Sequence, residues 1–311
     1  MAEAYADPPL NIEEITPYVI TKRSKIVREI LQKDKCYFYD TCSFRRHANL
    51  RTEEAAYFWK YIKNQNGIIV ITGSILMELG SRSGVLNREY IEYIEQMHCF
   101  GLSVLILREE DLFFVVDACF HTNAVINSYL CWAVRMLRGP VSTITETLQQ
   151  EPEIADEVIK GKNLERGTVY PHFFEAVRAR KETGDNLGEE MLALCLHILS
   201  HLPGEVDGKF CILTDDRGAA GKIDALFRKT AGQYRGKAFV ILSTPKLLQV
   251  LYQEGILVDP GVIESVLSAG TDGNISVLGN RMFDLRSQMI SQSCGELARL
   301  ITQPNGIYII F

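Results

Sequence analysis

The sequence lacks the patterns that mark membrane, secreted and disulfide-bonded proteins. Its apolar runs, such as residues 102–107, are strand-sized and far short of the about 18 residues that a transmembrane helix needs. The start, MAEAYADPPLNIEE, has no basic segment followed by an apolar one, so it does not resemble a secretory signal. The eight cysteines form no C-x-x-C motif and lie mostly in apolar runs. These absences predict a cytoplasmic protein with reduced, buried thiols and no membrane association.

The motifs of several enzyme classes are absent too. Neither G-x-S-x-G nor G-x-G-x-x-G occurs, which argues against a serine hydrolase and a dinucleotide-binding protein. The stretch RGAAGKIDAL fails the P-loop spacing at its first glycine. His197 and His201 have a spacing found in zinc sites, but no glutamate completes H-E-x-x-H, so a packing role is favoured. The net charge of −6 excludes a uniformly basic surface and leaves room for a local basic groove.

Apolar strands alternate with helical patterns through most of the chain. Five apolar stretches predict strands, at residues 36–39, 67–72, 102–107, 209–216 and 238–244. Apolar runs separated by helices are typical of a parallel sheet that is covered on both faces. We therefore predict an α/β fold: a three-layer α/β/α sandwich with a central, mostly parallel sheet.

Two segments depart from this alternation. Residues 139–184 contain few apolar anchors, and we expect a helical insertion or a flexible crossing within a domain that spans residues 1–255. Residues 256–311 are expected to form a C-terminal extension packed on that domain. The sequence GIYIIF at the end of this extension predicts one more strand.

Acidic residues follow several of the predicted strands. Asp40 comes directly after the first strand, and Glu78 lies in the helix that follows the second. Asp216 ends the fourth strand, and Glu189 lies at the start of the helix LALCLHIL. Each acid alone can be explained as a helix cap or a response to the helix dipole. The carboxyl ends of parallel strands share one edge of a sheet, however, and that edge is where ligands bind.

Carboxylates gathered at one edge repel each other unless a cation lies between them. Mg²⁺ and Mn²⁺ prefer oxygen ligands and keep waters that substrate phosphates can displace. One or two such ions could orient a water and stabilise the charge that develops when a phosphodiester bond is cleaved. The pattern of acids therefore indicates a Mg²⁺ or Mn²⁺ site.

Four stretches in this order, YFYDTCSF, VITGSILMELG, NLGEEMLALCL and ILTDDRGAA, resemble the PIN-domain nuclease family. The resemblance covers roughly residues 33–255 and implies a PIN-like fold and a metal-dependent nuclease. It also implies that the catalytic, metal-binding acids are Asp40, Glu78, Glu189 and Asp216. Glu189 fits the third acid better than Asp185, because it stands directly before the apolar run of its helix.

The resemblance assigns supporting roles to three further residues. Thr214 resembles the small hydroxyl residue that supports such a site. Asp215 is expected to be a metal ligand or a hydrogen-bond acceptor behind the ligands. Asp185 is expected to support the site as the cap of its helix.

Basic residues lie close to these acids in the sequence. Arg45 and Arg46 follow Asp40, and Arg217 and Lys222 follow Asp216, where they could bind a phosphate backbone. A solvated helix face explains them equally well. We expect a metal-dependent ribonuclease, most simply an endoribonuclease. RNA rather than DNA is favoured by the resemblance alone, and DNA stays open.

Other interpretations also stay open. The chain could be a non-catalytic PIN-like scaffold that binds RNA or protein, or, less well supported, a metal-dependent phosphatase. A homodimer and a protein inhibitor or antitoxin are further partners that the sequence leaves open.

Overall fold

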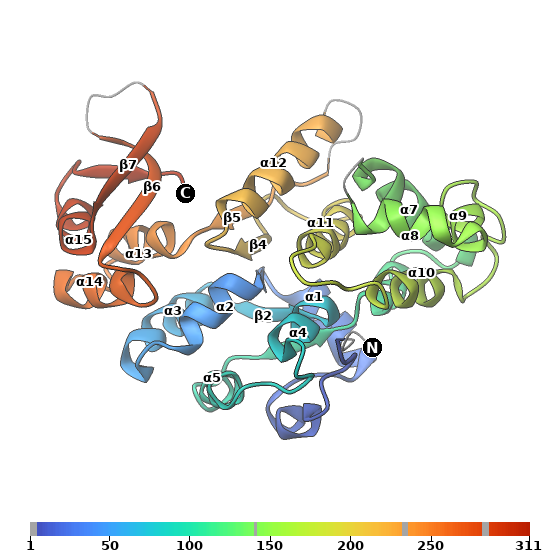
Figure 1. The fold of residues 1–311 in the computed structure, drawn as a ribbon, viewed down its shortest axis with the longest axis horizontal. Coiled ribbons are helices and arrows are strands. Elements are labelled where there is room, and N and C mark those ends of the chain that lie inside the picture. The colour runs from blue at the N-terminus through green and yellow to red at the C-terminus, as the bar shows by residue number, and fades with distance from the viewer. Residues whose placement is uncertain (1–4, 140–141, 232–235, 282–285) are drawn as a thin grey trace.

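The computed structural model describes residues 5–139, 142–231, 236–281 and 286–311 (Figure 1). Within these ranges the chain forms a five-stranded sheet flanked by helices and a three-stranded sheet near the C-terminus. The predicted α/β class and the layered arrangement of helices around a central sheet are thereby confirmed.

The five-stranded sheet is parallel throughout and has the order β3-β2-β1-β4-β5. Each strand lies at one of the predicted positions. The strands are β1 (Lys35–Tyr39), β2 (Gly67–Thr72), β3 (Val104–Leu107), β4 (Phe210–Leu213) and β5 (Val240–Leu242). All residues of β2, β3 and β4 are buried, as expected for strands covered on both faces.

The strand order reverses beside β1. The chain runs from β1 outward to β2 and β3, then returns to the other side of β1 to form β4 and β5. Such a reversal leaves a crevice at the carboxyl ends of the two strands that flank it, which is the usual ligand position in open α/β sheets. Here those strands are β1 and β4, so the crevice lies beside Asp40 and the Thr214–Asp216 segment.

Helices precede and cover the sheet. Before residue 139 the helices are η1 (Ile12–Glu14), η2 (Thr16–Tyr18), α1 (Arg23–Gln32), α2 (Thr41–Ala48), α3 (Thr52–Asn64), α4 (Gly73–Gly80), α5 (Arg88–Cys99), η3 (Glu109–Asp111), α6 (Leu112–Asp117) and α7 (Asn123–Leu137). The segment between β3 and β4 ends with α11 (Leu187–Ser200), and α12 (Arg217–Ala231) joins β4 to β5. Among the described residues, no helix is both long and apolar enough to span a membrane.

Residues 139–184 are largely helical in their described part, 139 and 142–184. They form α8 (Thr143–Gln150), α9 (Pro152–Val158) and α10 (Val169–Arg178), which group with α7 at one end of the molecule (Figure 1). The helices bury residues such as Ile144, Val158 and Phe173. In its described part, this segment is therefore helical, as one of the two alternatives expected.

The C-terminal part lies at the opposite end (Figure 1). It follows α13 (Thr244–Gln253) and consists of α14 (Pro260–Ser268), β6 (Asn274–Arg281), β7 (Gln288–Ser293), α15 (Cys294–Thr302) and β8 (Ile307–Ile309). The antiparallel sheet has the order β7-β6-β8, and β8 confirms the strand predicted from GIYIIF. Arg46 of α2 donates hydrogen bonds to the carbonyls of Val266 and Leu267, which ties this part to the helix that follows β1.

A buried cluster of charges connects α10 to the rest of the molecule. The Arg178 side chain is only 1% exposed and contacts Asp7, Glu109 and Glu110 at 2.7–2.8 Å. Glu109 is itself completely buried and accepts a hydrogen bond from the backbone N–H of Ser74, in the first turn of α4. Arg178 thus joins the N-terminal segment, η3, α10 and, through Glu109, α4.

Removing the charge of Arg178 should destabilise the fold strongly. Arg178→Met leaves Glu109 buried without its guanidinium partner, and we expect a loss of about 3–5 kcal/mol in the free energy of unfolding. Urea unfolding measures this loss. Arg88→Met is the control, because Arg88 is exposed and pairs with Glu92 on the surface, so its urea midpoint should stay unchanged. Equal midpoints for the two variants would contradict the anchoring role of Arg178.

Candidate active site

An open cleft of about 320 Å³ lies at the carboxyl edge of the parallel sheet. Five carboxylates line it, contributed by the end of β1, by α4, by the start of α11 and by the end of β4: Asp40, Glu78, Asp185, Glu189 and Asp216. The structure therefore brings together all four predicted catalytic acids and Asp185. Arg45 and Lys181 contribute positive charge to the same cleft.

Asp40 is the most buried of these acids, with 7% exposure. It caps α2, and its carboxylate accepts hydrogen bonds from the backbone N–H of Thr41, the thiol of Cys42 and the hydroxyl of Thr214. Burial raises the pKa of Asp40 above its usual value, although the three hydrogen bonds oppose that shift. Among the described residues no lysine or arginine forms an ion pair with Asp40. The donors that bond Asp40 within the described part of the chain are all neutral.

Glu78 reaches the cleft from α4, which begins directly after β2 because Thr72 caps it. One carboxylate oxygen accepts a 2.5 Å hydrogen bond from the Thr41 hydroxyl, and the other lies 3.0 Å from the ammonium of Lys181. The helix α11 starts so close to Glu78 that a Cβ at Gly188 would lie 2.6 Å from its carboxylate oxygen. Glycine at position 188 therefore permits the approach of α11 to Glu78.

Glu189 lies in a helix that is otherwise buried. Every residue of α11 is buried except Glu189 and Glu190, as expected of a helix in the middle of a domain. Glu190 turns to α8 and accepts hydrogen bonds from Ser142 and the Ile144 N–H, whereas Glu189 faces the cleft and pairs with Lys222 at 2.9 Å. The prediction preferred Glu189 to Asp185 as a catalytic acid, and both residues line the cleft.

The electrostatics of Glu189 show that the acids affect one another. Burial raises the pKa of Glu189, and the negative charges of Asp216 and Asp40 raise it further, while Lys222 lowers it. A cation that binds between carboxylates of one cleft relieves their mutual repulsion, and this relief favours its binding.

Asp185 forms part of a tight turn before α11. Its carboxylate accepts hydrogen bonds from the backbone N–H groups of Glu182 and Leu187 and from the ammonium of Lys181. Asn186, and not Asp185, occupies the cap position of α11. Asp185 nevertheless accepts a hydrogen bond from the N–H of Leu187, the first residue of the helix. These contacts make Asp185 part of the turn that positions Lys181 and the start of α11.

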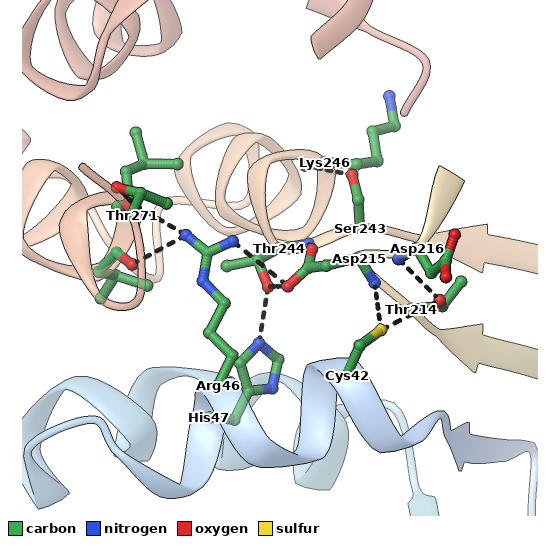
Figure 2. Close-up of polar contacts among 12 residues, drawn as sticks. Cys42, Arg46, His47, Thr214, Asp215, Asp216, Ser243, Thr244, Lys246 and Thr271 are labelled. Carbon is green, nitrogen blue, oxygen red and sulfur yellow. Dashed lines mark hydrogen bonds and ion pairs between the residues drawn. The ribbon is translucent and has the colours of Figure 1, made fainter. Parts of the chain in front are cut away.

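Asp215 and Asp216 have opposite roles. Asp216 faces the cleft, and one of its oxygens accepts from the N–H groups of Gly218 and Ala219 at the start of α12. Asp215 lies on the other side of the chain (Figure 2), where it accepts from the N–H and the hydroxyl of Thr244 and pairs with Arg46. The structure does not bring Asp215 to the cleft. The expectation that Asp215 is a metal ligand is therefore corrected, because its carboxylate is used to hold β5–α13.

Thr214 connects the two strand ends on either side of the reversal. Its hydroxyl donates to Asp40 at 2.7 Å and accepts from the backbone N–H of Asp216 at 3.1 Å. The supporting role predicted for Thr214 agrees with this geometry. The thiol of Cys42 lies against the same residues and accepts from the N–H of Asp215 (Figure 2).

The four basic residues expected to bind RNA lie in three different environments. Arg45 lines the cleft, where it donates to the carbonyl of Glu78, and Lys222 lies at its rim. Arg217 is exposed but extends toward Met289 of β7. The expectation that Arg46 binds RNA is corrected. Its side chain is 13% exposed, and its guanidinium pairs with Asp215 and donates to two carbonyls of α14. It stabilises the fold instead of facing a ligand.

Three further residues at the site were missed from the sequence, namely Thr41, Cys42 and Lys181. Thr41 and Cys42 directly follow Asp40, and their position at a helix start was the available signal. Lys181 had no comparable signal, because it follows α10 in a segment with few apolar anchors. Its side chain is only 5% exposed.

The donor set suits a hard divalent cation, since carboxylate oxygens are the ligands that Mg²⁺ and Mn²⁺ prefer. Within the part of the chain that the structure describes, no three His, Cys, Asp or Glu side chains form a ready metal-binding group. The ion pairs give a physical reason, because Lys181 holds Glu78 and Asp185, and Lys222 holds Glu189. Asp40 and Asp216 are the two acids of the cleft that lack a cationic partner among the described residues.

Comparisons with known proteins add no family assignment. No protein-family model matches the chain, and neither a curated protein nor a solved structure matches it.

A neutral histidine lies behind Asp215. Because Thr244 donates its hydroxyl proton to Asp215, it accepts from Nε2 of His47, and Nδ1 of His47 then accepts from the Tyr39 hydroxyl. Burial lowers the pKa of His47 to about 4, and the nearby charge of Asp215 opposes that shift. The bond between His47 and Thr244, which Figure 2 shows, and the bond from Tyr39 together fix one neutral tautomer.

Acid should weaken the native state through His47. Between about pH 6.5 and 4 the unfolded chain binds a proton at this histidine and the native chain does not, so stability falls as pH falls. His47→Gln removes this contribution. The difference in free energy of unfolding between the parent and the variant should shrink by about 2 kcal/mol from about pH 7 to 4.5. Urea unfolding over this range measures it, and a constant difference would show that His47 binds a proton equally well in the native and the unfolded chain.

Alanine at position 188 should be unfavourable although it stands in a helix. Alanine is normally favoured over glycine by about 0.5–1 kcal/mol, but here its methyl group would displace Glu78 from Lys181. Gly221→Ala in α12 is the matched control, since a Cβ there meets nothing within 4 Å. Chemical unfolding should show a gain for Gly221→Ala and none, or a loss, for Gly188→Ala. Equal gains would mean that Glu78 is not confined by α11.

Proposed function

We propose that this protein is a metal-dependent ribonuclease with a PIN-like domain. The observation that carries the proposal is the placement of Asp40 and Asp216. They face one cleft at the reversal of the strand order, and neither has a cationic partner among the described residues. Carboxylates that are bonded by neutral donors and lack a cationic partner keep their negative charge available to a cation.

Asp40, Glu189 and Asp216 are the side chains that would hold Mg²⁺ or Mn²⁺, with Glu78 beside them. A bound ion would supply an activated water and stabilise the charge that develops on the phosphate during cleavage. The chain's own residues prepare the ligands: Thr214 and the Thr41 N–H fix the orientation of Asp40, and the start of α12 fixes Asp216.

RNA would bind over the cleft through a local patch of positive charge. The patch consists of Arg45 in the cleft, Lys222 at its rim and the exposed Arg217. The whole chain has a net charge of −6, so attraction for a phosphate backbone has to come from such a patch. Contacts to phosphates carry no base specificity, which favours binding of generic RNA.

The adjacent aspartates provide a matched test of this proposal. Asp216→Asn keeps an oxygen that can cap α12 but loses the charge toward the cleft. It should reduce Mn²⁺-dependent cleavage of generic RNA by about 100-fold or more with little change in stability. Asp215→Asn should do the reverse: it should lower stability by about 1–3 kcal/mol, because Arg46 loses its charged partner, and preserve cleavage at a temperature where the variant is folded.

Cleavage rates across a Mn²⁺ titration and thermal melting curves are the two measurements. Full activity in folded Asp216→Asn would remove Asp216 from the mechanism. If the parent protein cleaves no RNA at any Mn²⁺ concentration, the nuclease proposal fails and a non-catalytic scaffold becomes the better interpretation.

A further inference from the structure

Lys181 is a buried cation inside the candidate active site. Its ammonium lies 3.0 Å from a carboxylate oxygen of Glu78 and also donates to Asp185, while the side chain is only 5% exposed. A lysine is rarely buried to this degree unless its charge is paired. Burial alone would favour the uncharged form, but Glu78 and Asp185 raise the pKa of Lys181 and keep it charged.

The position of this ammonium is fixed from several sides. The backbone N–H of Lys181 donates to the carbonyl of Arg178, so the lysine is anchored by the end of α10. The Tyr5 ring lies with its centroid 5.5 Å from the ammonium. Asp185 cannot readily turn away, because the N–H groups of Glu182 and Leu187 hold the same carboxylate. The ammonium of Lys181 therefore has a fixed position in the cleft.

Lys222 differs from Lys181 in each of these respects. Its side chain is 53% exposed, and it bonds Glu189 and Asn186 from the rim of the cleft. An exposed lysine can leave its partner at little cost, because water solvates both charges. A divalent ion could thus displace Lys222 from Glu189 far more easily than it could displace Lys181 from Glu78.

The cleft consequently has two unequal halves. One half contains Glu78 and Asp185, and Lys181 already offsets part of their negative charge. The other contains Asp40, Asp216 and Glu189, whose only cationic partner among the described residues is the exposed Lys222. A second cation in the first half would lie close to a buried positive charge, and like charges at short range repel strongly where water is scarce.

We propose that Lys181 is a built-in cation that takes the place of a second metal ion, so that the cleft binds one divalent ion, in the half formed by Asp40, Glu189 and Asp216. This inference rests on the proposed metal-dependent function and narrows it. Glu78 then serves to hold Lys181 rather than to bind metal. Lys181 is a positioning residue whose charge balances the acids on the side away from the ion.

The number of bound ions tests the proposal directly. Calorimetric titration with Mn²⁺ alone should give one ion per chain for the parent protein. Lys181→Met removes the ammonium and leaves Glu78 and Asp185 uncompensated, so a second Mn²⁺ should bind. Lys181→Arg keeps the positive charge and should bind one ion again. Lys222→Met, the matched control at the rim, should still bind one ion, with higher affinity because Glu189 is freed.

Two additional readouts keep the test decisive. Circular dichroism with and without Mn²⁺ establishes that each variant is folded, and Lys181→Gln, whose amide can still bond Asp185, replaces Lys181→Met if the latter does not fold. The electron paramagnetic resonance of bound Mn²⁺ distinguishes isolated ions from a coupled pair.

The outcomes separate this inference from the proposed function. Two ions in the parent protein, or one ion in both Lys181→Met and Lys181→Gln, would overturn the inference, and RNA cleavage would then decide the nuclease proposal by itself. Absence of Mn²⁺ binding by the parent protein would overturn both. One ion in the parent and two in the neutral variants of Lys181 would support both.

Discussion

The buried guanidinium of Arg178 is the interaction on which the geometry of the cleft depends. It is almost fully shielded from water and pairs with Glu109, Glu110 and Asp7. Glu109 in turn accepts from the first turn of α4, the helix that carries Glu78. Lys181 follows Arg178 by three residues and reaches the same Glu78. Arg178 at the end of α10 and Lys181 just beyond it therefore fix the wall of the cleft that carries Glu78. The helical segment 142–184 thus supports the site, although it lies mostly at one end of the molecule.

Charge balance explains how five carboxylates can share one cleft in a stable fold. Each acid is compensated in a different way: Asp40 by three neutral donors, Asp216 by the N–H groups of a helix start, and the other three by lysines. Neutral donors stabilise a carboxylate without removing its attraction for a metal ion. A lysine ammonium group held close to the carboxylate reduces that attraction, because it carries a fixed positive charge. The distribution of compensating groups, more than the number of acids, therefore decides where a cation can bind.

Much of the fold could be predicted from the sequence because its signals are local. Continuous apolar runs marked the five strands, and an acid immediately after a strand is visible without knowledge of distant residues. The sequence did not indicate that the side chains of Asp215 and Asp216 have different partners. The partners of Asp215 are Thr244 and Arg46, which are distant from it in the sequence. The same holds for Arg46, which appeared basic and available but is used by the carbonyls of α14. Lys181 escaped prediction because its role comes from partners that only the folded chain brings to it.

The segment Thr214–Asp216 links the cleft to the C-terminal part of the chain. Thr214 and Asp216 act toward the cleft, while Asp215 between them holds Arg46, whose guanidinium also binds the end of α14. Successive side chains of an extended segment point to opposite sides, so three consecutive residues can serve both purposes at once. The end of β4 is consequently constrained from both sides, and the position of Asp216 depends partly on contacts that the C-terminal part supplies. The described residues of the segment 256–311 thus contribute to the candidate site through the rigidity of this strand end, although none of those described residues lines the cleft.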